Sequence, residues 1–196
     1  MISKTFRALF LLAVFSSSAF CQIDSADSDL RKPRTWAISG EIGMNSLASL
    51  YGLTATWYAK PSLAVDAGVG ESSVGLRPGL RARYLFGPEK IAYFVGAGIK
   101  YGLGSGDQGI KFSDPETKKD ILLKTEASGF GDLMVGVEFL ANNGFLVIAN
   151  AGYSVLLGGK NYSFAIGSDV SDKTDKACNT IFGSGIMLSV SLGKAF

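Results

Sequence analysis

Eight charged side chains stand at alternating positions within otherwise apolar or small-residue segments, and ion pairing is the chemistry that this spacing allows. These charges are Glu41, Asp66, Arg77, Arg81, Arg83, Lys100, Asp132 and Glu138. Three arginines share one face of a single segment, and they cannot be buried together without carboxylates beside them, because an unpaired buried charge is costly. The charges therefore predict either a structural plug of salt bridges or a gate along a narrow ion path.

Patterns for catalysis and for ligand binding are weak in this chain. It contains no histidine, which is the commonest general base and metal ligand, and its serines have no candidate base. Residues 104–109 match GxGxxG, but a nucleotide site needs a helix after the motif, and a polar stretch follows here. Asp169, Asp172 and Asp175 are spaced by three, without the one-residue alternation and the glycine of a calcium loop. We therefore expect no enzyme activity, no cofactor and no bound metal.

The charge balance excludes a further class of function. The chain has 196 residues, a formal net charge of +2 and 18% charged residues. A nucleic-acid-binding protein needs a concentrated basic face, so nucleic acid is not an expected partner. The length is that of one domain.

The first residues have the pattern of an export signal. Lys4 and Arg7 precede an apolar run over 8–15, and Ala19-Phe20-Cys21 resembles a signal peptidase site. We therefore predict a cleaved signal peptide over residues 1–21. A buried N-terminal helix and a lipoprotein acylated at Cys21 are the alternatives, although the bulky Phe20 is unusual before a lipidated cysteine.

Cleavage after Cys21 leaves Cys178 as the single cysteine of the mature chain, so no internal disulfide can form. Cys178 is then either an incidental loop residue or the site of an intermolecular disulfide. Residues 22–35 are polar and contain Pro33, which predicts a short irregular periplasmic segment. No later apolar run reaches the roughly 20 residues that a membrane helix needs.

From residue 36 onward, apolar residues alternate with polar or small ones, and a period of two is typical of strands. Eight segments show this alternation: 36–44, 51–59, 63–70, 76–86, 91–101, 132–139, 145–154 and 186–196. Pro78 lies within one of them and predicts a local bulge or kink. One face of each segment is apolar, and the other carries small residues and the eight charges.

The connections between these segments alternate in length. Tight turns are expected at 60–62, 87–90 and 141–144, whereas the opposite ends carry 45–50, 71–75, 103–128 and 155–183. Aromatic residues gather near both ends of the segments, as they do at the two interfaces of a membrane. We therefore predict an eight-stranded antiparallel up-and-down transmembrane β-barrel over residues 36–196. Its last strand must pair with its first, because an open sheet edge cannot be satisfied in lipid.

Two stretches carry a family resemblance: the final strand 186–192 with the terminal Phe196, and the segment 93–98. They resemble the OmpA-like small outer-membrane β-barrels, the outer membrane protein beta-barrel domain family. The resemblance implies a location in the outer membrane, contact with its lipid, and insertion by the barrel-assembly machinery, with Phe196 as the assembly signal. Lys194 departs from that signal, in which an aromatic or apolar residue is usual at this position.

Three functions compete on this reading. The first is a structural or surface-interaction barrel that presents loops 103–128 and 155–183 to an unidentified extracellular partner. The second is a small channel or carrier for ions or apolar solutes. The third is a secreted lipocalin-like binder, which is less favoured because the Gly-x-Trp of a first lipocalin strand is missing: Trp36 follows Arg34-Thr35.

Overall fold

The computed structural model describes residues 30–72, 75–87, 90–106, 109–114, 116–118, 120–166 and 170–196. The expected signal peptide 1–21, most of the segment 22–35, and Asp169 therefore lie outside the described residues, as do parts of the turn 87–90 and of the glycine motif 104–109.

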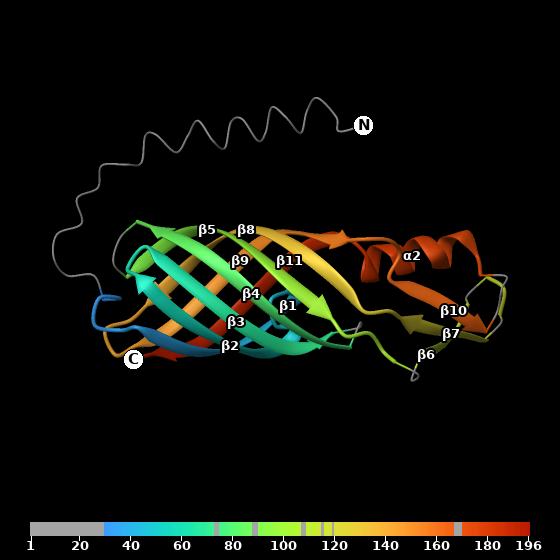
Figure 1. The fold of residues 1–196 in the computed structure, drawn as a ribbon, viewed down its shortest axis with the longest axis horizontal. Coiled ribbons are helices and arrows are strands. Elements are labelled where there is room, and N and C mark those ends of the chain that lie inside the picture. The colour runs from blue at the N-terminus through green and yellow to red at the C-terminus, as the bar shows by residue number, and fades with distance from the viewer. Residues whose placement is uncertain are drawn as a thin grey trace, which may run out of the picture.

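Eight strands form a closed antiparallel barrel in the order β1-β11-β9-β8-β5-β4-β3-β2 (Figure 1). The strands are β1 (Trp36–Ser46), β2 (Ser49–Lys60), β3 (Leu63–Ser72), β4 (Gly75–Phe86), β5 (Ile91–Gly102), β8 (Ser128–Leu140), β9 (Phe145–Leu157) and β11 (Gly185–Ala195). Each strand pairs with its predecessor and successor around the barrel, and β11 closes it against β1 from Ala37↔Ala195 to Met44↔Leu188. The prediction of an eight-stranded up-and-down barrel is confirmed.

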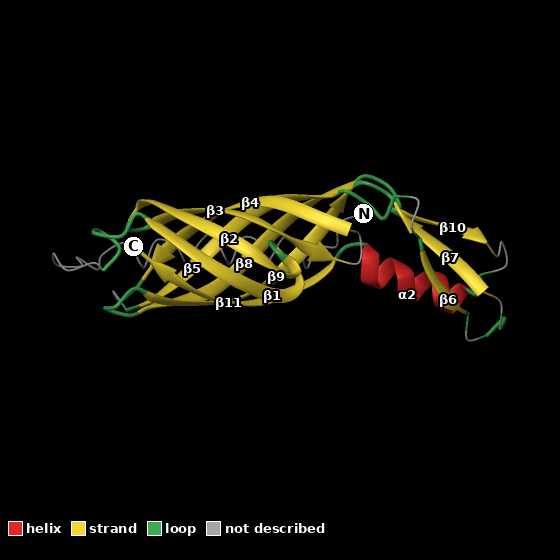
Figure 2. Ribbon diagram, turned by 90° about the horizontal axis from the view of Figure 1, so that it is seen from below, coloured by secondary structure: helices red, strands yellow, loops and turns green. Residues whose placement is uncertain are grey.

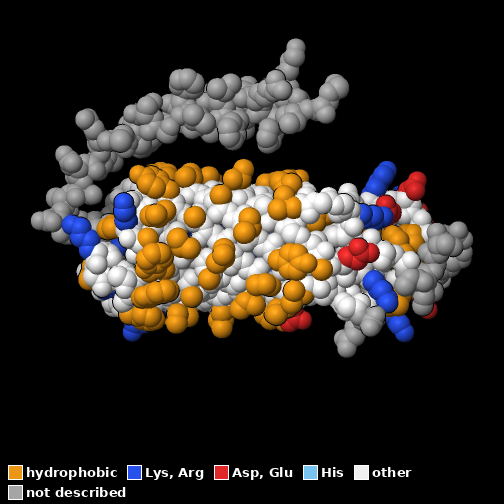
Figure 3. Space-filling view, viewed as in Figure 1, with side chains coloured by type: hydrophobic (Ala, Val, Ile, Leu, Met, Phe, Trp, Pro, Cys, Tyr) orange, Lys and Arg blue, Asp and Glu red, His pale blue; other side chains and the backbone are white. Residues whose placement is uncertain are grey.

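The alternation of the sequence becomes the two faces of the barrel wall. Ile42, Leu133 and Ile186 point outward and are 65%, 64% and 65% exposed, whereas the neighbouring Glu41 and Asp132 point into the lumen and are buried. Side chains of successive strand residues point to opposite faces of a sheet, so a period of two puts most of the large apolar residues outside, while a smaller apolar group that includes Phe94 and Ile148 faces the lumen. Figure 3 shows the resulting band of hydrophobic side chains on the visible face of the barrel.

The tight turns at 60–62 and 141–144 form where they were expected. A turn occupies Asn142 and Asn143, and Gly144 follows with φ of 85°, which favours glycine. The bulge predicted at Pro78 is wrong, because Val69↔Pro78 continues the β3–β4 register without a shift. Pro78 is tolerated because the β4–β5 ladder ends beside it, at Gly79↔Lys100, so no hydrogen bond to β5 is demanded of its missing N–H.

The two stretches expected to be long loops contain regular structure. They form a three-stranded sheet in the order β10-β7-β6 and one helix, α2 (Asp172–Phe182). The strands are β6 (Ile110–Ser113), β7 (Asp120–Thr125) and β10 (Tyr162–Ile166). These four elements, here called the outer cap, extend beyond the end of the barrel away from the chain's C-terminus (Figures 1 and 2).

The outer cap has a small apolar core of its own. Leu123, Tyr162, Cys178 and Phe182 are buried together, with Phe112 packed against them. Cys178 is thus a buried helix residue, and its expected place in a loop is wrong: α2 turns that face of the helix onto the cap sheet. Within the described residues, no helix has the length and apolarity needed to cross a membrane.

Candidate functional site

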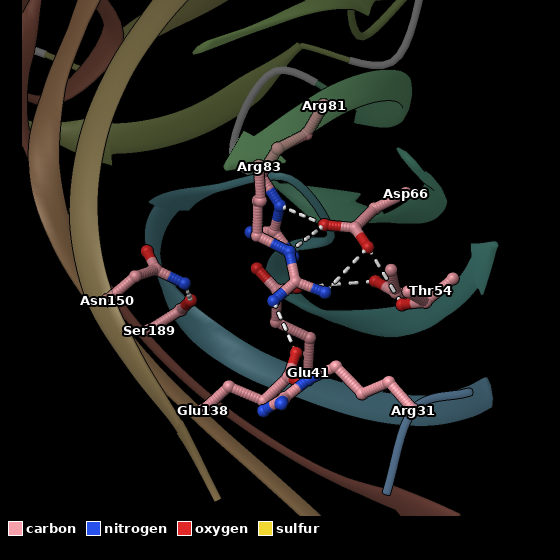
Figure 4. Close-up of polar contacts among 10 residues, drawn as sticks. Arg31, Glu41, Thr54, Asp66, Arg81, Arg83, Glu138, Asn150 and Ser189 are labelled. Atoms are coloured by element: carbon pink, nitrogen blue, oxygen red, sulfur yellow. Dashed lines mark hydrogen bonds and ion pairs between the residues drawn. The ribbon is translucent and has the colours of Figure 1, made fainter. Parts of the chain in front are cut away.

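Asp66 is the centre of a charge cluster in the middle of the lumen (Figure 4). Its Oδ2 accepts hydrogen bonds from Nε of Arg81 at 2.6 Å and from Nε of Arg83 at 2.7 Å. Its Oδ1 accepts from Arg83 Nη2 at 3.0 Å and from the Thr56 hydroxyl at 2.8 Å. Asp66 stands directly opposite Arg81 in the β3–β4 ladder, so neighbouring hairpin strands bring this pair together.

Two glutamates extend this cluster across the lumen to other strands. Glu41 on β1 forms a salt bridge with Arg81, with 3.4 Å between Oε2 and Nη2. Glu138 on β8 forms one with Arg83, with 2.7 Å between Oε2 and Nη1. The side chains of these pairs are fully buried. The Arg83 guanidinium also lies over the Phe94 ring, 5.0 Å from its centroid. Four strands are therefore tied together by charges inside the barrel, and we call this group the central cluster: Glu41, Asp66, Arg81, Arg83 and Glu138.

The other three predicted charges lie apart from the central cluster, nearer the outer cap. Lys100 binds both oxygens of Asp132, at 2.8 and 2.9 Å, and also donates to the backbone carbonyl of Asn45. Arg77 stacks its guanidinium over Phe130, 4.5 Å from the ring centroid. Among the described residues, no carboxylate forms a salt bridge with Arg77. The structure thus divides the eight charges into a central cluster of five and an outer group of three.

Arg31 belongs to the lumen as well, although no pattern in the sequence indicated this position. Its Nε donates to Glu138 Oε1 at 2.9 Å, and the residue is 4% exposed. Arg34 holds this segment across the short-turn end by donating to the carbonyls of Leu30 and Asn142. The segment was expected to be irregular and outside the barrel. Nothing in its composition distinguishes Arg31 from the other cations around it.

The β1–β2 turn folds into the opposite end of the lumen. Leu47 and Ala48 are 1% and 0% exposed, and Asn45 and Ser49 reach this shape with φ of 50° and 66°. A Cβ placed on Gly68 or on Gly79 would lie only 2.9 or 2.8 Å from the Leu47 side chain. The missing side chains of these glycines therefore make the space that Leu47 fills. This turn was expected among the outside loops, and its inward fold is a difference from that expectation.

The wall formed by β9 and β11 has a different character. Asn150 donates to the Ser189 hydroxyl at 2.7 Å, and Ser154 and Ser191 are buried there (Figure 4 shows the first pair). This wall carries no charged side chain into the lumen along its paired residues. The lumen is consequently asymmetric: salt bridges lie on one side, and uncharged polar groups together with the apolar side chains of Leu146, Ile148 and Met187 lie on the other.

Asp114 fixes the outer cap by joining the β6–β7 turn to the start of α2. Its side chain accepts hydrogen bonds from the backbone N–H of Ser171 at 3.0 Å and of Glu116 at 2.8 Å. These N–H groups, with Ser171 first, hold the pKa of Asp114 down to about 2. Ser171 in turn caps α2 by accepting from the backbone N–H of Thr174.

The exposed face of the outer cap mixes charges with aromatic rings. Lys160 and Asp175 form a salt bridge at 2.5 Å that is nearly half exposed, and Lys160 also lies 4.4 Å from the Tyr162 ring centroid. Asp172 and Asp175, two of the three aspartates spaced by three, both lie on α2. Among the described residues, no group of three or more acidic or cysteine side chains could hold a metal ion.

Phe196 lies at the seam between the first and last strands. Its backbone N–H donates to Trp36 O at 2.9 Å, its carbonyl accepts from Trp36 N–H at 3.2 Å, and its side chain is 56% exposed on the outer wall.

No protein-family model matches this chain, and no curated protein does. Three solved structures are similar, and each covers 83% of the chain. The N-terminal β-barrel domain of Pseudomonas aeruginosa OprF is 15% identical, with 98% of it covered and a TM-score of 0.49. E. coli outer membrane protein W is 18% identical, with 98% covered and a TM-score of 0.40. The Yersinia pestis outer membrane protein Ail is 16% identical, with 99% covered and a TM-score of 0.36.

Proposed function

We propose that this chain is an outer-membrane protein whose barrel spans the bilayer with a plugged lumen and whose outer cap presents an interaction surface outside the cell. In this proposal residues 1–21 are a cleaved signal peptide, the barrel-assembly machinery inserts the protein, and Phe196 is part of the signal which that machinery reads. The partner of the outer cap is unidentified.

One observation carries the proposal: a closed barrel whose outer wall is apolar and whose interior holds the charges. Soluble proteins cover their surface with polar and charged side chains, whereas this barrel exposes a continuous apolar wall and buries its charges beside an interior apolar cluster. In hydrocarbon, each unsatisfied backbone polar group costs several kcal/mol, and closure of β1 against β11 satisfies both edges. The outer wall therefore suits lipid, and the backbone pairing suits a medium without water.

Three features support a plug. The central cluster crosses the lumen, Arg31 lies at the short-turn end, and Leu47 fills the other end. An eight-stranded barrel has an interior about wide enough for side chains alone. In this proposal the paired charges fill the lumen and stabilise the folded barrel.

A small channel remains the second candidate because the β9–β11 wall of the lumen carries uncharged polar groups beside its apolar side chains. The hydroxyls of Ser39, Ser154 and Ser191 are buried and have no hydrogen-bond partner among the described residues. A file of water beside the salt bridges would satisfy them and could carry small ions. A lipocalin-like binder is disfavoured, since it would need an apolar lumen where this one holds charges.

Two measurements test the proposal. Alkaline extraction of isolated envelopes should leave the protein in the outer-membrane fraction, and release into the soluble fraction would overturn the membrane assignment. Planar-bilayer recordings of the purified chain should show no large steady conductance. Porin-sized currents would rule out the plug and favour the channel.

The orientation has its own test. Protease added to intact cells should cut in the outer cap, which is rich in exposed lysines such as Lys111, Lys118 and Lys176. Cleavage only after the outer membrane is broken would place the cap inside.

A further inference from the structure

The two ends of the molecule differ in the balance and in the pairing of their charges. Lys32 is exposed on the segment before β1 at the short-turn end, opposite the outer cap, and three further lysines are exposed there at strand ends or turns: Lys60, Lys90 and Lys194. Figure 3 shows Lys and Arg side chains at this end. Within the described part of the chain, none of these three forms a salt bridge. Glu89, which neighbours Lys90 in the sequence, lies outside the described residues. We call these three lysines the basic rim.

The far end has no such excess. In the outer cap, Lys160 pairs with Asp175 and Lys173 pairs with Glu116, and acidic residues are interspersed among the remaining lysines. Figure 3 shows side chains of both signs at that end. The basic rim is therefore a feature of one end and not a property of the whole surface.

The lysines of the basic rim lie at the edge of the apolar outer wall. Lys194 is on the outward face of β11, two residues from Leu192, and its cross-strand partners Phe145 and Ile38 are exposed. Lys90 directly precedes Ile91, whose cross-strand partner is Phe139. Lys60 ends the strand that carries Trp57. A lysine in this position can keep its stem along the apolar wall and turn its ammonium toward headgroups.

We propose that the basic rim binds the phosphate headgroups of anionic phospholipids in the leaflet on the short-turn side. This inference rests on the proposed function, since it requires the barrel to span the bilayer. A lipid ligand fits better than a soluble polyanion, because the outward face of Lys194 is shared with aliphatic and aromatic side chains. Ammonium groups near an anionic membrane surface attract its lipids, and the attraction is screened by salt.

The chain carries built-in reporters for this test. It has two tryptophans, Trp36 and Trp57, which lie at the same end with their ring centroids 6.4 Å apart and are 52% and 46% exposed. Their fluorescence is quenched by brominated lipid that contacts them. Brominated phosphatidylglycerol and brominated phosphatidylcholine can then be compared in vesicles of the same bulk composition.

For the full mature chain reconstituted in phosphatidylcholine vesicles, a small fraction of brominated phosphatidylglycerol should quench more than the same fraction of brominated phosphatidylcholine. A local preference of about fivefold is expected for each lysine that contacts the headgroup. The preference should disappear in the triple variant Lys60→Gln, Lys90→Gln, Lys194→Gln, and it should weaken at high salt. The matched control Lys111→Gln, Lys118→Gln, Lys176→Gln removes the same charge from the outer cap and should keep it.

Equal quenching by the two brominated lipids in the unmodified protein would overturn the inference and leave the membrane assignment standing. Loss of the preference in both triple variants would also overturn it, since net charge and not the rim would be responsible. Absence of quenching by either lipid would instead contradict the proposed membrane insertion. Circular dichroism of each variant establishes that the barrel has folded.

Discussion

Arg31 contacts Glu138 across 107 positions of sequence, with its Nε 2.9 Å from Oε1 of the glutamate. Arg83 Nη1 forms a salt bridge with the other oxygen of the same carboxylate, Oε2, at 2.7 Å. A residue that precedes the first strand thus shares its partner with a residue from the middle of the barrel. Arg31, just before β1, is therefore part of the folded lumen.

This shared carboxylate orders the effects of two substitutions. Arg31→Ala should destabilise the barrel less than Glu138→Ala, because Glu138 retains Arg83 in the first case and two cations each lose a salt bridge in the second. Breaking a buried pair from one side costs about 3–5 kcal/mol, so Glu138→Ala should lose at least that much. Unfolding by denaturant in detergent, followed by tryptophan fluorescence, measures the order. Equal losses would contradict the prediction that Glu138 stabilises the barrel through both Arg31 and Arg83.

Arg81 offers a test of pairing across the lumen. Arg81→Met leaves Glu41 and part of Asp66 without a cation and should cost about 3–5 kcal/mol of unfolding free energy. Glu41→Gln should recover part of this loss, because Arg81 is the one salt-bridge partner of Glu41 among the described residues. Asp66→Asn should recover less, since Asp66 also holds Arg83. Equal recovery of unfolding free energy by Glu41→Gln and by Asp66→Asn in the Arg81→Met background would contradict this prediction.

The folded-in β1–β2 turn predicts a steric effect at glycine. Gly68→Ala should destabilise the barrel by about 1–3 kcal/mol, because its Cβ would press on Leu47 at 2.9 Å and overpacking is unfavourable. Leu47→Ala in the same chain should relieve most of that loss. Gly40→Ala is the matched control, since a Cβ there meets nothing within 4 Å. A similar loss in both glycine variants would argue against the insertion of Leu47.

Asp114 predicts how the outer cap responds to acid. Its pKa is held down to about 2 in the folded cap, below the value of about 3.9 expected in an unfolded chain. Its contribution to stability is therefore present above pH of about 4 and is lost as the pH falls toward 2. The protection of the α2 amide protons against hydrogen exchange, relative to the intrinsic exchange rate at each pH, should decrease as the pH falls through this window. Asp114→Asn should remove this pH dependence, and Asp120→Asn, at the exposed start of β7, should retain it.

Substitution of Phe196 can distinguish an effect on assembly in cells from an effect on the stability of the folded barrel. Its two backbone hydrogen bonds with Trp36 survive Phe196→Ala, so the variant should refold in detergent with little loss. If the ring belongs to the assembly signal, the same variant should reach the outer membrane in reduced amount in cells. Deleting Phe196 also removes the two hydrogen bonds and should affect both measurements. Normal delivery of Phe196→Ala would contradict the role as a signal.

The sequence by itself determined the barrel and which residues face each way. Alternation fixes the face of every strand residue, because successive side chains point to opposite sides, and turn residues such as Gly144 fix where hairpins close. The hairpin connection between β3 and β4 also brings Asp66 beside Arg81, because the strands of a tight hairpin have few possible registers. Local rules were sufficient for each of these features.

Contacts between distant segments depended on the tertiary structure alone. Arg81 meets Glu41, and Arg31 meets Glu138, only because closure brings strands and termini far apart in the sequence to the same level of one narrow lumen. Leu47 turns inward because Gly68 and Gly79 come to lie together across the β3–β4 pair. The outer cap likewise forms where β7 can bury Leu123 against α2. A period of two carries no information about which distant side chains will share a space, and packing in the closed barrel decides it.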